Sequence, residues 1–190
     1  MLQCVISSPR MITAVIRANR DAEALAATLS VLIPAVARGV IGHAVVIDDG
    51  DDAAIARLAD ETGASYVRAQ NGEAWSSGAA QARGDWVILL EAGDLPEPAW
   101  TPSIERHLLT AAARPALMPL RGMAAALREW GAVSLRSRGV RAGLLAPKTQ
   151  ILSGRLARAP RRLSVRRERA ALKLRAGWCG RCRSSACCRT

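Results

Sequence analysis

The sequence has no apolar run long enough to cross a membrane. A transmembrane helix needs about 18 consecutive apolar residues, and no run in the 190 residues reaches that length. The N-terminus also lacks the charged start and cleavage pattern of a secretory signal peptide. We therefore expect a cytoplasmic protein. Residues 1–10 are a candidate N-terminal extension, because Met11 directly precedes the first predicted strand.

Several common catalytic motifs are missing as well. The chain contains no Gly-x-Ser-x-Gly, no P-loop and no Gly-x-Gly-x-x-Gly, so the usual signatures of a nucleophile elbow, a P-loop nucleotidase and a dinucleotide-binding turn are absent. Histidine is scarce, and neither His43 nor His107 has a cysteine or carboxylate at a metal-ligand spacing. We expect no metal or catalytic role for either.

Acidic residues are nearly absent from the C-terminal end, which carries the whole net charge of +11. Through Gly154 there are 15 Lys/Arg and 15 Asp/Glu, whereas from Arg155 onward 12 Lys/Arg face only Glu168. We therefore divide the chain into a domain over residues 11–154 and a basic tail over 155–190.

Leucines and a valine among the arginines of residues 155–175 permit a basic amphipathic helix. Such a helix would bind an anionic membrane surface, which would place the protein at the inner face of the cell membrane. The alternative is a solvated, partly disordered tail. In either case we expect the tail to lie outside the core, so that deleting residues 155–190 would leave the melting temperature nearly unchanged. Nucleic acid is not expected as a partner, because Trp178 is the only aromatic residue of the tail and no nucleic-acid motif is present.

The end of the tail is rich in cysteine. Cys179 and Cys182 form a Cys-x-x-Cys pair, but the following Cys187 and Cys188 are adjacent, and no histidine follows. This spacing is wrong for a zinc site. The composition differs so much from the domain before it that translation out of frame is an alternative origin for the segment.

Two short apolar runs end abruptly in acidic residues. Residues 45–50 read Val-Val-Ile-Asp-Asp-Gly, and residues 86–94 read Trp-Val-Ile-Leu-Leu-Glu-Ala-Gly-Asp. Runs this short favour strands buried on both faces of a sheet rather than helices. In open α/β sheets ligands bind outside the carboxyl ends of the strands, so these acids are candidate ligand contacts. The alternative is that the acids of residues 48–52 solvate a turn and cap the next helix.

Hydrophobic periodicity and turn residues predict strands that alternate with helices, and therefore an α/β fold with a mostly parallel sheet. The predicted strands are Ile12–Ile16, Val45–Ile47, Ser65–Arg68 and Trp86–Leu90. The predicted helices are Asp21–Ile33, Asp51 or Asp52 to Gly63, Glu73–Arg83, Pro98–Ala113, Met123–Arg138 and Pro147–Leu156. We expect the second and fourth strands to be neighbours or one strand apart, with their acidic ends on the same rim.

This order of elements resembles the nucleotide-sugar-binding half of family 2 glycosyltransferases, which have the Rossmann-like GT-A fold. The most specific part is Ala-Arg-Gly-Asp-Trp at residues 82–86, which leads into an apolar strand, an acidic turn and Pro96-Glu97-Pro98. The resemblance covers residues 11–112. A weaker similarity to the acceptor-side strand and helix of the family runs from Gly143 to Gly154.

The resemblance implies a nucleoside diphosphate sugar as donor and a divalent cation, Mg²⁺ or Mn²⁺, that neutralises the departing pyrophosphate. The family holds this cation with an Asp-x-Asp motif. Here the aligned positions are Glu91 and Gly93, and Asp94 follows one residue later. The candidate metal ligands are therefore Glu91 and Asp94, in an altered motif that puts metal-dependent transfer in doubt. If a cation binds there, Gly93→Asp should strengthen its binding.

The same resemblance assigns Asp48 or Asp49 to the base or ribose of the nucleotide. Arg17, which stands where the family usually has proline, and Arg83 are candidates for the diphosphate, although a strand-end arginine can simply be solvated. Asn71 lies in the loop that approaches the donor in the family, and Asn-Gly is also a generic turn pair.

No catalytic base is evident. An inverting transfer needs a base to deprotonate the acceptor hydroxyl, and the family places an acidic pair after the turn that Ser153-Gly154 resembles. Here that region offers Glu168 among arginines, and Glu129 lies on a predicted surface helix face. Two functions stay open. One is a glycosyltransferase acting on an acceptor such as a cell-envelope glycan or lipid. The other is an inactive binding module with this fold and a basic tail.

Overall fold

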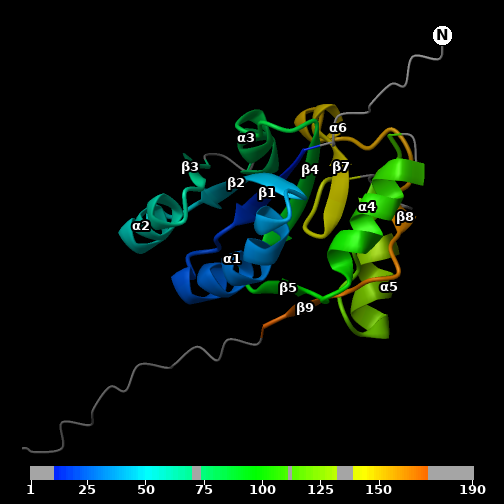
Figure 1. Ribbon diagram of the computed structural model, residues 1–190, viewed down its shortest axis with the longest axis horizontal. Coiled ribbons are helices and arrows are strands. Elements are labelled where there is room, and N and C mark those ends of the chain that lie inside the picture. The colour runs from blue at the N-terminus through cyan, green and yellow to red at the C-terminus, as the bar shows by residue number, and fades with distance from the viewer. Residues whose placement is uncertain (1–10, 70–73, 111–112, 132–138, 171–190) are drawn as a thin grey trace, which may run out of the picture.

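A sheet with the strand order β3-β2-β1-β4-β7-β6-β8 forms the centre of the molecule (Figure 1). The computed structural model describes residues 11–69, 74–110, 113–131 and 139–170. The strands of this sheet are β1 Ile12–Arg17, β2 Ile41–Asp48, β3 Ser65–Arg68, β4 Trp86–Glu91, β6 Ala116–Leu117, β7 Leu144–Pro147 and β8 Arg161–Arg162. A second, two-stranded sheet pairs β5 Asp94–Pro96 with β9 Arg167–Arg169 in antiparallel orientation.

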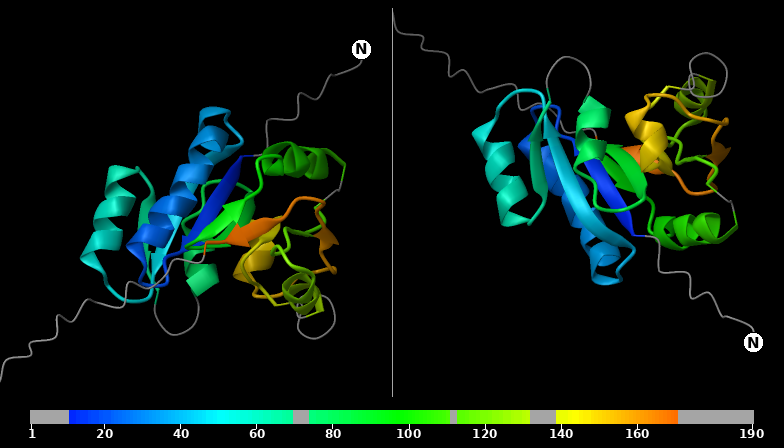
Figure 2. Two further views of the ribbon diagram at one scale, coloured as in Figure 1. Left: turned by 90° about the horizontal axis from the view of Figure 1, so that it is seen from below. Right: turned by 90° about the horizontal axis from the view of Figure 1, so that it is seen from above.

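Helices cover both faces of the large sheet. They are α1 Ala22–Ala37, α2 Ala53–Glu61, α3 Ala74–Ala80, α4 Trp100–Thr110, α5 Met123–Gly131 and α6 Lys148–Leu152. One apolar cluster joins the sheet to α1, α2 and α4, and a second joins the opposite face to α3 and α6 (Figure 2). Gly78 in α3 permits the close approach on the second face, because a Cβ there would lie 2.6 Å from side-chain atoms of Val15 and Ile47. None of the helices in the described ranges is long and apolar enough to span a membrane.

The predicted strand arrangement is confirmed. β1 lies between β2 and β4 and runs parallel to both, so β2 and β4 are one strand apart. In this register Arg17 lies beside Ile47 of β2 and beside Glu91 of β4. The carboxyl ends of the three strands therefore share one rim. Strands β1, β2 and β4 are buried along nearly their whole length, as expected of runs that are apolar on both faces.

Local sequence explains both ends of α2. The Asp52 side chain accepts a hydrogen bond from the backbone N–H of Ala54 and so caps α2, and the turn after this helix contains Gly63 with a φ of +69°. The first helix is longer than predicted. It continues past Pro34 to Ala37, because Leu29, Leu32 and Ala35 remain buried against the sheet on the same face.

The expectation that the segment from Arg155 onward lies outside the core, as an amphipathic helix or as a solvated tail, is wrong for residues 155–170. This segment contains β8, β9 and an extended connection, and its side chains Leu156, Leu163 and Val165 are buried in the core. β8 is parallel to β6 at the edge of the large sheet, and β9 pairs with β5. The apolar residues of this segment fit a strand as well as a helix. The chain is extended here because its backbone pairs with the edge of the sheet and its alternate side chains enter the core. Residues 171–190, with their cysteines, lie outside the described residues, and membrane contact by them stays a prediction.

Candidate functional site at the carboxyl rim

Charged side chains gather where β1, β2 and β4 end. The two acidic ends predicted to share a rim do so, since Asp49 directly follows β2, Glu91 ends β4, and Arg17 ends the strand between them. Beyond β4 the chain turns through Gly93 into β5, which brings Asp94 back to this rim. The Asp94 carboxylate accepts a hydrogen bond from the Glu91 backbone N–H at 2.9 Å.

Asp48 has a structural role at this rim. Its side chain is fully buried, and its carboxylate accepts hydrogen bonds from the backbone N–H groups of Gly50 and Asp52 and from the Tyr66 hydroxyl. Burial alone would raise the pKa of Asp48, but the hydrogen bonds from Asp52, Gly50 and Tyr66 together outweigh it and leave the pKa lowered. The pKa of Tyr66 is raised, first by burial and then by its bond to Asp48. Asp48 thus holds the turn that carries Asp49.

Asp49 is the acid of this pair that faces the open rim. It forms an ion pair with Arg17, whose Nε donates to Asp49 Oδ2 at 2.7 Å, and the two side chains are 28% and 38% exposed. Both groups are therefore within reach of a ligand. An aspartate can accept hydrogen bonds from a base N–H or ribose hydroxyl, and an arginine can bind phosphate oxygens.

Glu91 and Asp94 are paired with arginines of β9. Arg169 Nη2 lies 2.5 Å from Glu91 Oε2 and 3.1 Å from Asp94 Oδ1, and Arg167 Nη1 lies 2.8 Å from the same Asp94 oxygen. Arg167 and Asp94 are fully buried, whereas Arg169 is 45% exposed. Burial would lower the pKa of Arg169, but Asp94 and Glu91 outweigh it and raise the pKa above its ordinary value. Arg169 therefore stays charged.

Sequence reasoning missed Arg167 and Arg169 as parts of the site. They lie far along the chain from Asp94, in a segment interpreted as a tail. The only signal was the alternation Arg-Glu-Arg at residues 167–169, which places the two arginines on one face of a strand and Glu168 on the other.

One predicted donor contact lies away from the rim, and another lies outside the described residues. Arg83 precedes β4 and so lies at the amino ends of the strands, opposite the rim. Burial lowers the pKa of His43, and the charge of Arg83 lowers it further. Asn71 lies outside the described residues. Of the predicted nucleotide contacts, the structure brings Arg17, Asp48 and Asp49 together, with Glu91 and Asp94 beside them.

Structural comparison finds the same architecture in known enzymes. No protein-family model and no curated protein matches the sequence. Solved structures do match, among them glucosyl-3-phosphoglycerate synthase of Mycobacterium tuberculosis in complex with Mn²⁺, UDP and phosphoglyceric acid, with a TM-score of 0.55 and 21% identity over 74% of this chain and 56% of that one. The same enzyme with phosphoglyceric acid alone gives a TM-score of 0.54 at 22% identity, over 74% of this chain and 57% of that one. The fold is that of a GT-A glycosyltransferase.

The chain spans a little over half the length of these GT-A structures. At this level of identity the comparison establishes the fold, and the chemistry depends on the residues at the rim. A third match is the same synthase with Mn²⁺, UDP-glucose and phosphoglyceric acid, at a TM-score of 0.55 and 21% identity, over 74% of this chain and 57% of that one.

A divalent cation does not fit the residues present at this rim. Asp94 Oδ1 accepts from Arg167 and Arg169, and its Oδ2 accepts from the Glu91 N–H. Glu91 is bound to Arg169 through Oε2. Among the described residues there is also no cluster of three or more His, Cys, Asp or Glu side chains that could hold a metal. Gly93 has a φ of +86°, where an aspartate would be strained, so Gly93→Asp is not expected to supply the missing ligand as the sequence suggested.

The two candidate bases are also engaged. Glu129 does not lie on an open helix face as predicted, because its carboxylate pairs with the buried Arg167 and accepts a hydrogen bond from the Leu120 N–H at 2.9 Å. Glu168 pairs with Arg121 on the outer side of β9. In the described part of the chain, every carboxylate that β4, β5, β9 or α5 brings to this region is thus held by a cation.

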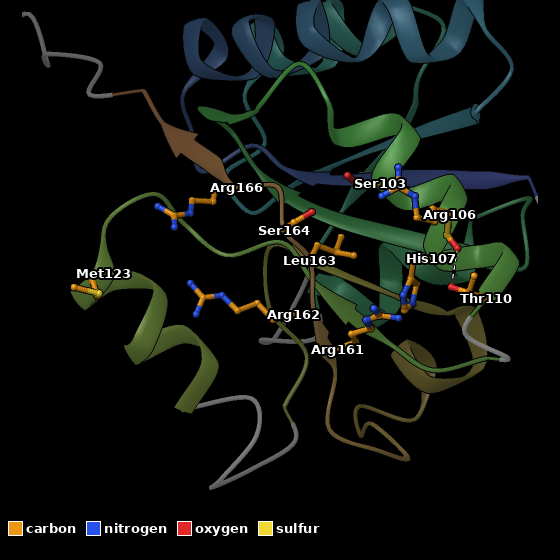
Figure 3. Close-up of a pocket in the computed structure, with 10 residues that line it drawn as sticks. All are labelled: Ser103, Arg106, His107, Thr110, Met123, Arg161, Arg162, Leu163, Ser164 and Arg166. Carbon is orange, nitrogen blue, oxygen red and sulfur yellow. Dashed lines mark hydrogen bonds between the residues drawn. The ribbon is translucent and has the colours of Figure 1, made fainter.

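A basic pocket of about 740 Å³ opens beside this region, between α4, the start of α5 and the β8 segment (Figure 3). It is lined by Ser103, Arg106, His107, Thr110, Met123, Arg161, Arg162, Leu163, Ser164 and Arg166. Its four arginines form no ion pair with any described residue, and no carboxylate is among the lining residues. Arg166 lies at the β9 end of the pocket, directly before the buried Arg167.

His107 forms part of the pocket wall and was not expected to have a role. It is buried, its Nε2 lies 2.8 Å from the Arg114 carbonyl oxygen, and its Nδ1 has no partner among the described residues. Burial lowers the pKa of His107; the bond to Arg114 raises it, and the nearby Arg161 and Arg114 lower it further. The ring is therefore neutral at pH 7. Because Nε2 donates to a carbonyl, Nδ1 is an acceptor.

Proposed function

We propose that the protein binds a nucleoside diphosphate sugar at the carboxyl rim of β1, β2 and β4 and transfers the sugar to an acceptor. The observation that carries the proposal is the half-exposed pair of Arg17 and Asp49 at this rim, in a chain with the GT-A fold. Ligands of open α/β sheets bind at this edge, where the strand ends leave a crevice. UDP-glucose is the first donor to test, because it is bound in similar structures.

Each rim residue has a role in this proposal. Asp49 would accept hydrogen bonds from the nucleotide base or ribose, since its carboxylate is the accessible one. Asp48 would position it by fixing the turn over residues 48–52. Arg17 would face the diphosphate, because guanidinium groups bind phosphate oxygens in bidentate geometry.

The basic pocket supports an acceptor that carries a phosphate or carboxylate. Four arginines that form no ion pair with a described residue favour an anion. The similar synthase has been crystallised with phosphoglyceric acid and with glycerol 3-phosphate. We therefore propose a small phosphorylated hydroxy compound, in place of a cell-envelope glycan or lipid, as the first acceptor to test.

The second candidate function is a binding module without transferase activity. One observation favours it, namely that Glu91, Asp94, Glu129 and Glu168 all pair with arginines. A carboxylate tied to a guanidinium is poorly placed as a base, because it has to leave that ion pair before it can reach the acceptor hydroxyl. This function would retain donor binding and lose transfer.

Titration calorimetry with UDP-glucose and GDP-glucose tests the donor site. We expect one of the two to bind, and we expect Asp49→Asn and Arg17→Ala each to weaken binding by about tenfold or more, the loss of one charged hydrogen bond. Arg121→Ala is the matched control, because Arg121 forms an exposed ion pair with Glu168 on the outer side of β9. Equal affinity in all variants would move the donor away from this rim.

An assay of released nucleotide separates the two functions. With 3-phosphoglycerate as acceptor, a transferase releases UDP or GDP at a rate that depends on the acceptor. A binding module binds the donor and releases no more nucleotide than the donor alone does. Arg162→Ala should raise the KM for the acceptor and leave donor affinity unchanged, since Arg162 lines the basic pocket only.

A further inference from the structure

Two arginines lie where the Asp-x-Asp motif of the GT-A fold would require a divalent cation. Arg167 and Arg169 point from one face of β9 at the carboxylates of Glu91 and Asp94. The pairing is fixed by backbone bonds on both sides, from the Glu97 N–H to the Arg166 carbonyl and from the Ala170 N–H to the Gly93 carbonyl. The arrangement is therefore built into the strand pairing.

The two guanidinium groups supply the positive charge that a metal would otherwise supply. Arg167 and Arg169 face Glu91 and Asp94 and together carry two positive charges, as many as one Mg²⁺ or Mn²⁺. A third carboxylate, that of Glu129, also pairs with Arg167. A divalent cation placed between the same carboxylates would have to displace these arginines or approach both of them without screening from water. Repulsion between the cation and the guanidinium groups would oppose binding strongly in a partly buried site, since the effective dielectric there is well below that of water.

We propose that the Arg169 guanidinium, supported by Arg167, takes the place of the divalent cation, so that the nucleoside diphosphate binds at this rim without metal. The inference rests on the proposed donor site and names the group that neutralises the diphosphate there. Arg167 is fully buried and supplies the fixed charge behind Asp94, whereas Arg169 is close to half exposed and can contact a ligand.

Arg169 still has hydrogen-bond donors for a phosphate. Its contacts with Glu91 and Asp94 use Nε and Nη2. Its Nη1, with two N–H groups, has no partner among the described residues, and a guanidinium carries five N–H donors in all. Arg17 ends the strand that lies beside Glu91 in register, and Arg169 pairs with the Glu91 side chain, so both arginines lie at the end of β4. A diphosphate bound there would be neutralised by both.

Nucleotide titration in the presence and absence of metal tests the inference. UDP and GDP are titrated into the full chain in EDTA and in MnCl₂. We expect the affinity of the nucleotide that binds to agree within about twofold between the two conditions. Arg169→Ala should weaken binding in EDTA by about tenfold or more. Arg169→Lys should weaken it less, because lysine retains the positive charge and loses only the bidentate geometry of the guanidinium group. Arg121→Ala, which removes an exposed arginine from the outer side of β9, should change nothing.

Binding that requires Mn²⁺, or that Mn²⁺ strengthens tenfold, would overturn this inference and leave the proposed donor site intact. Absence of nucleotide binding in both conditions would overturn the proposed function and the phosphate role of Arg169 together. Unchanged affinity in Arg169→Ala would also remove that role.

Direct measurement of Mn²⁺ separates the metal question from the nucleotide. We expect the electron paramagnetic resonance signal of free Mn²⁺ to be unchanged by the wild-type protein and to be reduced by Arg169→Ala, in which the two acids lose their exposed partner. Stoichiometric Mn²⁺ binding to the wild type that disappears in Glu91→Gln would show that the acids hold a metal after all.

Discussion

The two sides of the candidate site hold their charges in different surroundings. On the β1–β2 side, Arg17 and Asp49 pair at the surface, with side chains 38% and 28% exposed. On the β4–β5 side, Arg167 and Asp94 are fully buried, and Glu129 and the half-exposed Arg169 complete the cluster. The exposed ion pair can exchange its partners at little cost in free energy. The buried ion pair cannot, because separating its charges would leave each one unpaired in the interior.

The exposed charges of this rim are therefore available for ligand binding, whereas the buried ones stabilise the fold. A surface ion pair contributes about 0–1 kcal/mol, so Arg17 and Asp49 are free to exchange each other for a ligand. A buried ion pair cannot open without exposing charge to a low-dielectric interior. We infer that β9 completes the core at the β4–β5 side, and that only the outer edge of this cluster, at Arg169, takes part in ligand binding.

Among single substitutions, the largest expected effect is that of removing Arg167. Arg167→Ala leaves the carboxylates of Asp94 and Glu129 without their buried partner, and breaking a buried pair in this way costs about 3–5 kcal/mol. Urea unfolding followed by circular dichroism measures the loss. Arg166→Ala is the control, because the neighbouring Arg166 side chain is exposed and forms no ion pair with a described residue. Equal stability of the two variants would show that β9 is peripheral.

Deleting residues 155–190 should act in the same direction. The sequence alone predicted an unchanged melting temperature, whereas the structure predicts a large decrease. The deletion removes Leu156, Leu163 and Val165 from the core together with Arg167. A buried leucine alone contributes about 2–5 kcal/mol when it is cut back to alanine.

The parallel part of the fold could be predicted because its information is local. The runs at residues 12–17, 45–48 and 86–91 are apolar, short and followed by turn or cap residues, so each segment by itself predicts a strand. Their alternation with helices predicts parallel strands whose carboxyl ends share one rim. The acidic residues at their ends were therefore placed correctly. Arg83 was placed wrongly, because it comes before the first residue of β4 and therefore lies at the amino end of that strand, away from the rim.

The β9 part could not be predicted, since its partners are far apart in sequence. Arg167 and Arg169 bind Asp94 across 73 and 75 residues. β8 and β9 are only two and three residues long, too short for a periodic pattern. A run of arginines also looks the same in sequence whether each one is solvated or paired, and here Arg167 is buried whereas Arg166 is exposed.

An intermediate loss of stability is expected for changes at Asp48. This residue is buried like Arg167, but its carboxylate is held by hydrogen bonds and not by an ion pair. Asp48→Asn replaces one of its acceptor oxygens by a donor, which should cost about 1–3 kcal/mol at pH 7. The folded-state pKa lies below the ordinary value of 3.8, so the stabilisation is present above pH 4 and is lost as the pH falls through the folded pKa. The stability difference between wild type and variant should therefore shrink below pH 4 in thermal melts. A difference that stays constant with pH would rule out this role for the charge.

The smallest effect on stability, and one of the larger effects on binding, is expected for the Arg17–Asp49 pair. Both side chains are partly exposed, so Arg17→Ala and Asp49→Ala should each change the free energy of unfolding by less than about 1 kcal/mol, and a double-mutant cycle should give a coupling of similar size. The same two variants should lose nucleotide affinity, because the guanidinium group of Arg17 and the carboxylate of Asp49 are the groups proposed to contact the ligand. Arg167→Ala should do the reverse, with a large loss of stability and, at temperatures where it is still folded, a smaller loss of affinity. If the coupling between Arg17 and Asp49 instead reached 3 kcal/mol, as for a buried pair, the pair would be a structural element, and the donor would have to be sought at another part of the rim.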